Sequence, residues 1–382
     1  MIYRTLGKDN LKVSQLGFGC MRLPIINKDT KKIDVEKTRE LLKYAINNGV
    51  NYIDTAYPYH GGKSEEVVGK ILNDENLRNK VYFTSKLSLW MIEDKKGQEI
   101  FLNNQLKRAN QKFFDFYLVH ALNNKSWQTA KKFDTLNFLD EAKKNGKIKY
   151  TGFSFHDESI ELFKEIVDSY NWDLVQIQYN YLDTNYQAGE EGLKYCEKKG
   201  IDCVIMEPLK GGQLANELPS KAQNIFKQYN STNSYASWAL RWLFNQKNIK
   251  VVLSGMGELD QVIDNIKSAS IYNENCLNDV EETLINQTVA IIKNRKRIPC
   301  TNCKYCLPCP QGVLIPKNFS FYNKYYSSNS EKNKTDVKNL YSTLLKSEEK
   351  ASSCIKCGLC EKHCPQNLNI IDLLKDVKKT LE

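Results

Sequence analysis

The first 270 residues alternate between two patterns of hydrophobic positions. Short apolar runs recur at intervals of about 30 residues, and longer stretches with helical spacing of apolar side chains lie between them. This alternation is typical of repeated strand–helix units, which build a parallel sheet. The expected strands are Leu16–Gly19, Asn51–Asp54, Val81–Lys86, Phe116–His120, Ile148–Phe153, Leu174–Gln178, Cys203–Met206 and Val251–Leu253.

The helical stretches lie between these strands. Eight strands with eight crossovers in this length predict an α/β fold, the (β/α)8 TIM barrel. An open, doubly wound sheet is the alternative, and it requires a G-x-G-x-x-G turn after the first strand. The first strand ends Gly17-Phe18-Gly19-Cys20, which does not fit that turn. Helices are expected at Val35–Asn48, Gln98–Asn110, Leu136–Lys144 and Ser159–Val167, and a hairpin at residues 2–14 is expected to plug the barrel floor.

The pattern changes after residue 270, and 382 residues are enough for one large and one small domain. We expect a barrel over residues 1–275, a helical connector over 276–297 and a small, mostly helical domain over 298–382. The net charge of +10 comes largely from scattered lysines, and the one dense basic run is 293–297. No apolar run approaches the length of a membrane span. Neither a nucleic acid nor a membrane is expected as a partner.

Eight of the twelve cysteines lie in two short runs. The first cysteine run (Cys300–Cys309) reads C-T-N-C-K-Y-C-L-P-C, and the second (Cys354–Cys364) reads C-I-K-C-G-L-C-E-K-H-C; a proline follows each. The C-x2-C-x2-C spacing with a remote cysteine before proline resembles the ferredoxins with two 4Fe–4S clusters. The resemblance implies a ferredoxin-like domain in which each run's last cysteine completes the other cluster. The implied sets are Cys300, Cys303, Cys306 and Cys364, and Cys354, Cys357, Cys360 and Cys309.

Zinc and disulfides are the competing interpretations of these cysteines. Structural zinc usually takes paired cysteine hooks, and a tetrahedral site has no use for a third cysteine at the same tight spacing. Disulfides need an oxidising compartment, and the polar start Met-Ile-Tyr-Arg-Thr does not resemble a secretory signal. We therefore expect iron–sulfur clusters and a cytoplasmic protein. One departure from the ferredoxin pattern is that two residues, where three are usual, precede Cys309.

The active site of such a barrel lies at the C-terminal ends of its strands. Asp54, Lys86 and His120 end the second, third and fourth expected strands, and Tyr59 lies in the loop after the second. These four residues resemble the catalytic tetrad of the aldo-keto reductases. The resemblance covers about residues 1–270. It extends to Gly152-Phe153-Ser154, Gln176–Asn180 and Glu207–Gly212.

The resemblance implies a role for each tetrad residue. A carbonyl that accepts hydride must also receive a proton on oxygen, and Tyr59 is the expected proton donor in reduction. Because tyrosine is a weak acid, with an unperturbed pKa of about 10, we expect the Lys86 ammonium to lower the pKa of Tyr59. Asp54 is expected to hold Lys86 and compensate its charge. His120 is expected to hydrogen-bond the substrate carbonyl.

The same resemblance implies a nicotinamide dinucleotide, NAD(H) or NADP(H). Ser154 and Gln176 match the residues that hydrogen-bond the carboxamide, Met206 stands where many members stack a tyrosine, and Asn265 matches the residue that contacts adenine. Many NADP-using members place cations after strand eight, but residues 253–258 hold none, which favours NADH. The remaining expected contacts are Leu209, Gly211, Gly212, Ser254 and Gly255.

The sequence thus predicts an NAD(P)(H)-dependent oxidoreductase that interconverts a carbonyl and an alcohol and carries two 4Fe–4S clusters for electron transfer or for structure. Its partners would be a small carbonyl or alcohol and an electron-transfer protein. The alternative is a redox-sensing or electron-transfer module whose nicotinamide-binding barrel turns over slowly. The substrate is not predicted.

Overall fold

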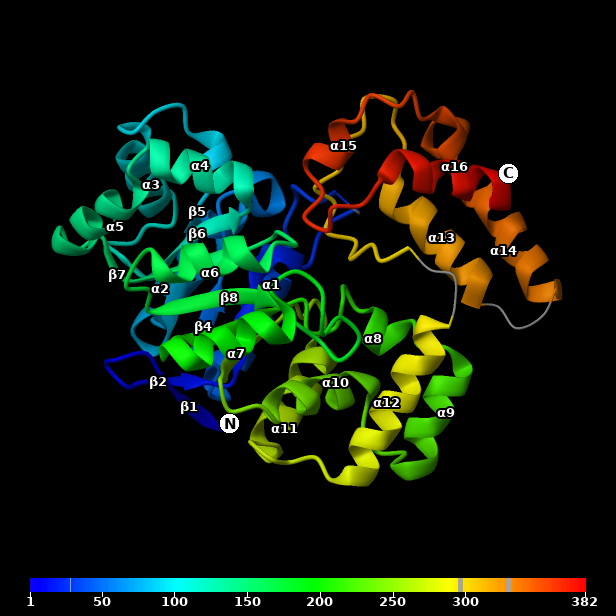
Figure 1. The fold of residues 1–382 in the computed structure, drawn as a ribbon, viewed down its shortest axis with the longest axis horizontal. Helices are drawn as coiled ribbons and strands as arrows, with labels where there is room; N and C mark the ends of the chain where they lie inside the picture. Colours follow the sequence, from blue (N-terminus) through cyan, green and yellow to red (C-terminus); the bar gives the residue numbers. More distant parts are fainter. Residues whose placement is uncertain (28, 295–297, 328–330) are drawn as a thin grey trace. The chain divides into compact units, whose positions relative to one another are not determined.

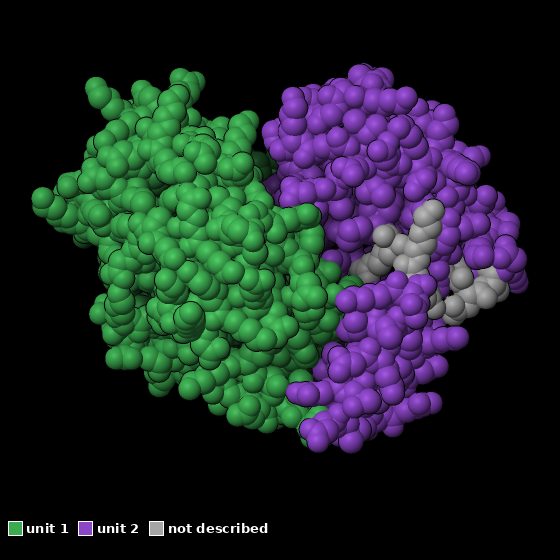
Figure 2. Space-filling view, in the orientation of Figure 1, with its two compact units in different colours: residues 1–209, 236–278 green, residues 210–235, 279–382 purple. Residues whose placement is uncertain are grey.

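The computed structural model describes residues 1–27, 29–294, 298–327 and 331–382. Packing divides the chain into two compact units (Figure 2). The barrel unit comprises residues 1–209 and 236–278, and the lobe unit comprises residues 210–235 and 279–382. The boundaries expected from the sequence stay a prediction, but one difference is clear: residues 210–235 pack with the C-terminal residues. Part of the basic run, residues 295–297, lies outside the described residues.

Eight parallel strands close into a barrel, as predicted (Figure 1). The strands follow one another around the barrel in chain order, and β10 closes it against β3. An antiparallel hairpin, β1 (Tyr3–Leu6) with β2 (Leu11–Ser14), precedes them. The barrel strands are β3 (Leu16–Gly19), β4 (Tyr52–Asp54), β5 (Tyr82–Leu87), β6 (Phe114–Leu122), β7 (Ile148–Phe155), β8 (Leu174–Gln178), β9 (Asp202–Met206) and β10 (Ile249–Ser254).

Helices of the barrel unit surround the strands (Figure 1). Their starts have local causes: the Asp34 carboxylate accepts the Lys37 N–H at 3.1 Å, and the Ser159 hydroxyl accepts the Leu162 N–H at 3.1 Å. The helices are α1 (Val35–Asn47), α2 (Ser64–Asp74), α3 (Gly97–Arg108), α4 (Asn124–Lys132), α5 (Thr135–Lys144), α6 (Ile160–Asp168), α7 (Gly189–Lys199), α10 (Tyr235–Phe244) and α11 (Leu259–Ile271).

The barrel interior is apolar toward the N-terminal ends of the strands, here called the floor, and polar toward their C-terminal ends, here called the top. Because side chains alternate along a strand, every second residue points inward. The lower inward positions form one hydrophobic cluster with Leu6 and Val13 of the hairpin, so the hairpin closes the floor as predicted. Six side chains that are polar or carry sulfur lie near the C-terminal ends of six strands: Asp54, Lys86, His120, Ser154, Gln176 and Met206.

The lobe unit is helical in its described residues. Helix α9 (Ser220–Tyr229) packs on α12 (Asp279–Lys293), and α13 (Ile315–Ser327) packs on both α14 (Glu331–Leu344) and α16 (Ile370–Leu381). Residues of α13, α14 and α16 form a hydrophobic core, and six of the eight cysteines of the two runs pack against it. Two short helices, α8 (Gln213–Asn216) and α15 (Leu359–Lys362), complete the unit. No described helix combines the length and the apolar character needed to cross a bilayer.

Candidate active site and cluster-binding lobe

The buried ammonium of Lys86 is the centre of the polar layer at the top of the barrel. Its Nζ donates to Asp54 Oδ1 at 2.6 Å, to the Thr55 carbonyl at 2.8 Å and to Tyr59 Oη at 3.3 Å. Lys86 is 0% exposed and Tyr59 is 8% exposed. All three donor hydrogens of the ammonium therefore have acceptors, which a buried charge requires. The structure brings together Asp54, Tyr59 and Lys86 as the sequence predicted them to lie.

Burial dominates the proton affinities of this group. It raises the pKa of Asp54, and the Lys86 ammonium opposes the rise. It also raises the pKa of Tyr59 well above 10, and the field of Asp54 adds to the rise, while Arg22 opposes it. We expected Lys86 to lower the pKa of Tyr59; the net direction is upward, because burial has the largest effect. Tyr59 therefore carries its proton at neutral pH, as a proton donor must.

His120 lies beside Tyr59, with ring centroids 6.0 Å apart. Its Nδ1 is 3.1 Å from the hydroxyl of Ser88, a fully buried residue that our sequence reasoning missed. Burial lowers the pKa of His120 well below 6.5, and the Lys86 charge adds to this shift, so the imidazole is neutral. Ser88 follows Lys86 by two residues and so points the same way, a period-two signal that could have identified it. Trp90, 52% exposed, lies 5.0 Å from the His120 ring.

A second buried network, also missed from the sequence, supports the backbone of Lys86. Gln105 donates to the Lys86 carbonyl at 3.0 Å and to Glu65 Oε1 at 2.6 Å. Glu65 is fully buried and also accepts a hydrogen bond from Ser85 at 2.5 Å. Burial raises the pKa of Glu65. The network ties α2 and α3 to the strand end that presents the ammonium.

The expected nicotinamide contacts lie at neighbouring strand ends. The Ser154 hydroxyl oxygen accepts the Ala121 N–H at 2.7 Å, which leaves its own hydrogen available to a ligand. Gln176 Nε2 lies 3.6 Å from the Met206 sulfur. Within the described chain, Gln176 Oε1 is buried without a hydrogen-bond partner. A carboxamide, with one acceptor and two donor hydrogens, fits these two side chains.

The loop after β10 holds the residues expected at the adenosine end. Asn265 Nδ2 donates to the Ser254 hydroxyl at 2.9 Å, and both side chains are buried. A β-carbon at Gly255 would lie 3.2 Å from the Arg22 side chain, which would have to shift slightly. At the start of α11, the carboxylate of Glu258 pairs with Lys37 at 2.6 Å. Lys37 is thus engaged by an acid, and Arg22, which lies against Gly255, pairs with Glu207 at 3.1 Å.

The loop after β9 divides between the two units. Leu209 is the last residue of that part of the barrel unit, whereas Gly211 and Gly212 belong to the lobe unit. Both glycines have left-handed backbones, with φ of +67° and +92°. A side chain at either position would strain the backbone. The structure therefore does not place Gly211 and Gly212 in one compact unit with Ser154 and Gln176.

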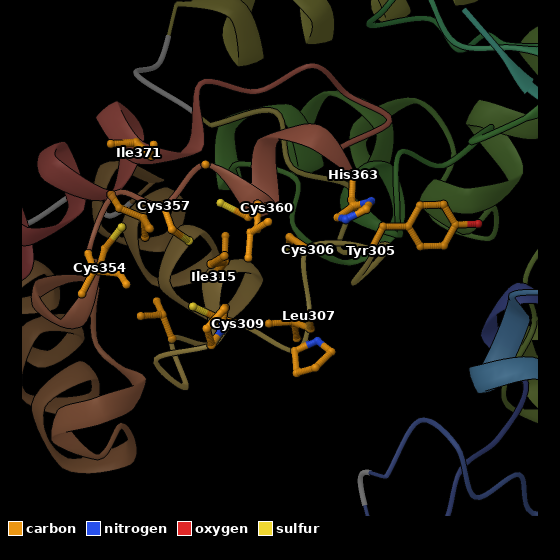
Figure 3. Close-up of a pocket in the computed structure, with 17 residues that line it drawn as sticks. Tyr305, Cys306, Leu307, Cys309, Ile315, Cys354, Cys357, Cys360, His363 and Ile371 are labelled. Carbon is orange, nitrogen blue, oxygen red and sulfur yellow. The ribbon is translucent and has the colours of Figure 1, made fainter. Parts of the chain in front are cut away.

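The cysteines line two hollows in the lobe unit. One is lined by Cys300, Cys303, Cys306 and Cys364. The other is lined by Cys309, Cys354, Cys357 and Cys360, with Cys306 also in its wall (Figure 3). Each hollow thus takes its remote cysteine from the other run, in the grouping that the ferredoxin resemblance implies. The volumes are ≈ 10 Å³ and ≈ 270 Å³ respectively, so the first hollow is much the tighter of the two.

The backbone of the two runs shows the same conformation. The second and fourth residues after the first cysteine of each run are left-handed, with φ from +56° to +75°. Alternating backbone of this kind turns successive N–H groups toward one side and forms a nest for anions, as many iron–sulfur sites do. The Asn302 N–H already points to the Cys300 sulfur, 3.4 Å away. The four left-handed residues are Asn302, Lys304, Lys356 and Gly358.

Proton affinities of the cysteines match the same grouping. Burial raises the pKa of Cys306, and the further contributions come from Cys303, Cys300 and Cys364. Burial also raises the pKa of Cys360 to about 11, with Cys354 among the smaller contributors. Thiolates are therefore costly here unless a metal displaces the proton. No three His, Cys, Asp or Glu side chains among the described residues close around a single metal ion.

The barrel with this polar layer is an oxidoreductase scaffold, and family comparisons identify it. Residues 15–275 match the model of the aldo/keto reductase family. The match covers more than half of the chain, so the protein belongs to that family. Residues 299–369 match the 4Fe-4S dicluster domain. The chain is thus an aldo-keto reductase, an oxidoreductase enzyme, joined to an iron–sulfur domain of the ferredoxin type.

Similar proteins agree with the barrel assignment. An uncharacterized oxidoreductase of Bacillus subtilis is 25% identical over 300 residues, which cover 70% of this chain and 90% of that protein. The NADH-specific methylglyoxal reductase of Escherichia coli is 24% identical over 331 residues, which cover 74% of this chain and 96% of that protein. An aldo-keto reductase of Klebsiella pneumoniae, solved with NADPH, superposes with a TM-score of 0.61 over 75% of this chain and 95% of that one. At 21% identity, this last likeness shows the fold alone.

The two hollows make a prediction about cluster ligation. Cys364→Ser should lower the iron content from about eight to about four atoms per chain, because two cubanes hold eight irons and one is lost. Adding Cys303→Ser should remove no further iron, since both cysteines line the same hollow. Adding Cys357→Ser should remove the remainder. Iron and acid-labile sulfide assays of anaerobically purified protein measure this, with Cys276→Ser as the control that keeps all eight irons. The reverse pattern in the double variants contradicts cross-ligation.

Proposed function

We propose that this aldo-keto reductase interconverts a small carbonyl compound and its alcohol with NADH, and that its eight C-terminal cysteines hold two 4Fe–4S clusters. The observation that carries the enzymatic part is the buried contact of Lys86 with both Asp54 and Tyr59. Burying the Lys86 ammonium beside a protonated phenol costs free energy, because the charge is removed from water. The charge becomes favourable when the phenol loses its proton, because the ammonium then lies beside a phenolate.

Tyr59 is the proposed general acid in reduction. Its raised pKa keeps it protonated until a carbonyl oxygen gains negative charge beside it. Lys86, 3.3 Å from Tyr59 Oη, would stabilise the phenolate left after proton transfer. Asp54 holds the lysine at 2.6 Å and balances its charge in the low-dielectric interior. In the oxidative direction the same phenolate would accept the proton of the alcohol.

His120 is the proposed second hydrogen-bond donor to the carbonyl. A neutral imidazole carries one N–H, so its two nitrogens cannot both donate. If the Ser88 hydroxyl donates to Nδ1, the N–H lies on Nε2 and can donate to a substrate oxygen. Ser88 would then be a positioning residue that selects this tautomer. Trp90, half-exposed against the His120 ring, is the proposed wall of the substrate entrance.

Ser154, Gln176 and Met206 would hold the nicotinamide of the dinucleotide. When bound, the nicotinamide supplies or accepts the hydride. The preference for NADH is supported by the acid at the expected adenosine end, because Glu258 would repel a 2′-phosphate and already occupies Lys37. Of the similar proteins, the Escherichia coli enzyme is named as NADH-specific, whereas the Klebsiella pneumoniae structure holds NADPH. We propose NADH as the cofactor because of the negative charge of Glu258.

The clusters would supply one-electron chemistry to a protein partner. The support is the position of the second cysteine run at the surface. Cys357 is exposed, and two of its neighbours, Ile355 and Leu359, are among the exposed large hydrophobic residues of the described chain. A cluster held at such an edge can exchange electrons with a docked protein. An electron-transfer partner is therefore part of the proposal.

Tyr59→Phe tests the proposed chemistry. Loss of the general acid should lower kcat by about two to four orders of magnitude, while dinucleotide affinity stays nearly unchanged. Anaerobic steady-state assays with small aldehydes, together with NADH fluorescence titration, measure both quantities. Tyr57→Phe is the matched control and should keep wild-type turnover. Turnover near the wild-type value in Tyr59→Phe means that another group protonates the carbonyl.

The pH profile of reduction should be flat through neutrality. Burial lowers the pKa of His120 well below 6.5 and that of His156 to about 4, and it raises that of Tyr59 above 10. Between pH 6 and pH 9, roughly, none of these groups should change its charge. The measurement is kcat/KM for aldehyde reduction against pH. An inflection near 6.5 that disappears in a His120→Asn variant is the contrary result.

Glu258→Gln should shift the cofactor preference toward NADPH. The change removes the charge that repels the 2′-phosphate and releases Lys37 to bind it. For an exposed pair of this kind the ratio of kcat/KM values, NADPH over NADH, should rise about two- to fivefold. Glu75→Gln, which breaks ion pairs with Lys43 and Arg39 of α1, is the control. A wild-type preference for NADPH overturns the cofactor proposal outright.

A further inference from the structure

Glu65 is a fully buried acid that has no part in the chemistry proposed above. It is the second residue of α2 and is 0% exposed. Its Oε1 accepts hydrogen bonds from the Ser85 hydroxyl at 2.5 Å and from Gln105 Nε2 at 2.6 Å. A buried charge is costly unless hydrogen bonds and an opposite charge compensate it. These two hydrogen bonds therefore offset part of the cost of burying Glu65.

The geometry favours the ionised form of Glu65. Its Oε1 already accepts two hydrogen bonds, and Oε2 is buried without a hydrogen-bond partner among the described residues. A proton on Oε2 would therefore be an unpaired buried donor, which costs free energy. In the ionised form, Oε2 lies 3.9 Å from the Arg108 guanidinium, and the start of α2 is the positive end of the helix dipole. Burial raises the pKa of Glu65, but its hydrogen bonds and the charges of Arg108 and Lys86 oppose the rise.

Glu65 holds the backbone of Lys86 at two places. Its first hydrogen-bond donor, Ser85, is the residue before Lys86 on β5. Its second donor, Gln105, also donates to the Lys86 carbonyl at 3.0 Å. Gln105 Oε1 accepts the Tyr117 hydroxyl at 2.6 Å, so both ends of the amide are fixed. The carboxylate thus anchors a rigid set of donors around the strand end that presents the ammonium.

The residue before Glu65 holds the other side of the ammonium. Ser64 donates to the Cys20 carbonyl at 3.1 Å, so it accepts the hydrogen bond from the Thr55 hydroxyl, 2.8 Å away. The Thr55 carbonyl is one of the acceptors of the Lys86 ammonium. The start of α2 therefore contacts both the strand that carries the ammonium and the loop that receives it.

We propose that Glu65 is a positioning residue for proton transfer, whose buried carboxylate holds Lys86 so that its ammonium stays within reach of both Asp54 and Tyr59. Because this role concerns proton donation by Tyr59, it rests on our proposed function. The ammonium lies 3.3 Å from Tyr59 Oη, and a hydrogen bond of that length weakens when the donor is displaced. Glu65 also adds a second negative charge near the ammonium, where the low dielectric strengthens attraction. It contacts no reacting atom and acts through Lys86.

Glu65→Gln tests this role in the anaerobically purified holoenzyme. Glutamine has nearly the same shape and keeps an oxygen for Ser85 and Gln105, but it removes the charge. The single-turnover rate of NADH oxidation by a small aldehyde should fall about ten- to a hundredfold, as expected when hydrogen bonds to a charged group are weakened. NADH affinity, measured by fluorescence titration, should stay unchanged. The matched control is Glu66→Gln, which breaks an exposed pair with Lys63 at the next position of α2 and should keep the wild-type rate.

A double variant shows whether Glu65 acts through the lysine. In a Lys86→Met background, adding Glu65→Gln should lower the rate little further, because the effects of residues that act as a unit are not additive. If Glu65 only stabilised the barrel, the two losses would multiply. Circular dichroism at the assay temperature shows whether each variant is folded. If Glu65→Gln does not fold, Ser85→Ala removes one hydrogen bond of the carboxylate and should lower the rate about three- to tenfold.

The outcomes separate the positioning role from the proposed function on which it rests. If the wild type reduces no small aldehyde with NADH or NADPH, or if Tyr59→Phe keeps the wild-type rate, the proposed function fails. If Tyr59→Phe is slow but folded Glu65→Gln keeps the wild-type rate, the positioning role is wrong and the proposed function stands. Multiplying losses in the double variant also contradict the role, as does a loss of NADH affinity that accounts for the whole effect.

Discussion

The buried ion pair between Lys86 and Asp54 is the constraint around which the barrel unit is built. A charge that is 0% exposed needs acceptors for every donor hydrogen, and the closed barrel supplies them from the end of β4, the strand next to that of Lys86, and from the loop after β4. The hydrophobic floor formed by the hairpin keeps water away from below. The network of Gln105 and Glu65 holds the Lys86 backbone from the outside. The arrangement concentrates one positive charge beside one phenol, which is what proton donation to a carbonyl needs.

The main constraint on the lobe unit is that it must order two cysteine runs that have little regular secondary structure. The two runs have matching left-handed residues, and six of their cysteines pack against the helical core of the unit. Residues 210–235 belong to this unit, and Gly211 meets the backbone of Thr301 there.

Much of this could be predicted from the sequence because its signals are local. Short apolar runs that alternate with helical stretches identified all eight barrel strands, and β3 and β8 begin and end at the predicted residues. The positions of Asp54, Lys86 and His120 at the ends of expected strands placed them in one site. Three features could not be predicted. The contact of Gly211 with Thr301 joins residues 90 positions apart, so no periodic pattern records it. The pKa of Tyr59 depends first on burial, which a charge inventory does not reveal, and its net shift is therefore upward. In the sequence, residues 210–235 resemble an ordinary connection between two barrel strands, but in the structure they pack with the lobe unit.

The central claim is that the Lys86 ammonium at the top of the barrel makes this protein a carbonyl reductase. The most direct test measures single-turnover oxidation of bound NADH by a small aldehyde, without oxygen, in the wild type and in Lys86→Met. Lysine and methionine are similar in length, so the variant removes the charge with little change in volume. The account predicts that the variant binds NADH normally but oxidises it about two to four orders of magnitude more slowly, as the loss of an effective general acid requires. Equal rates of NADH oxidation in the two proteins would contradict it.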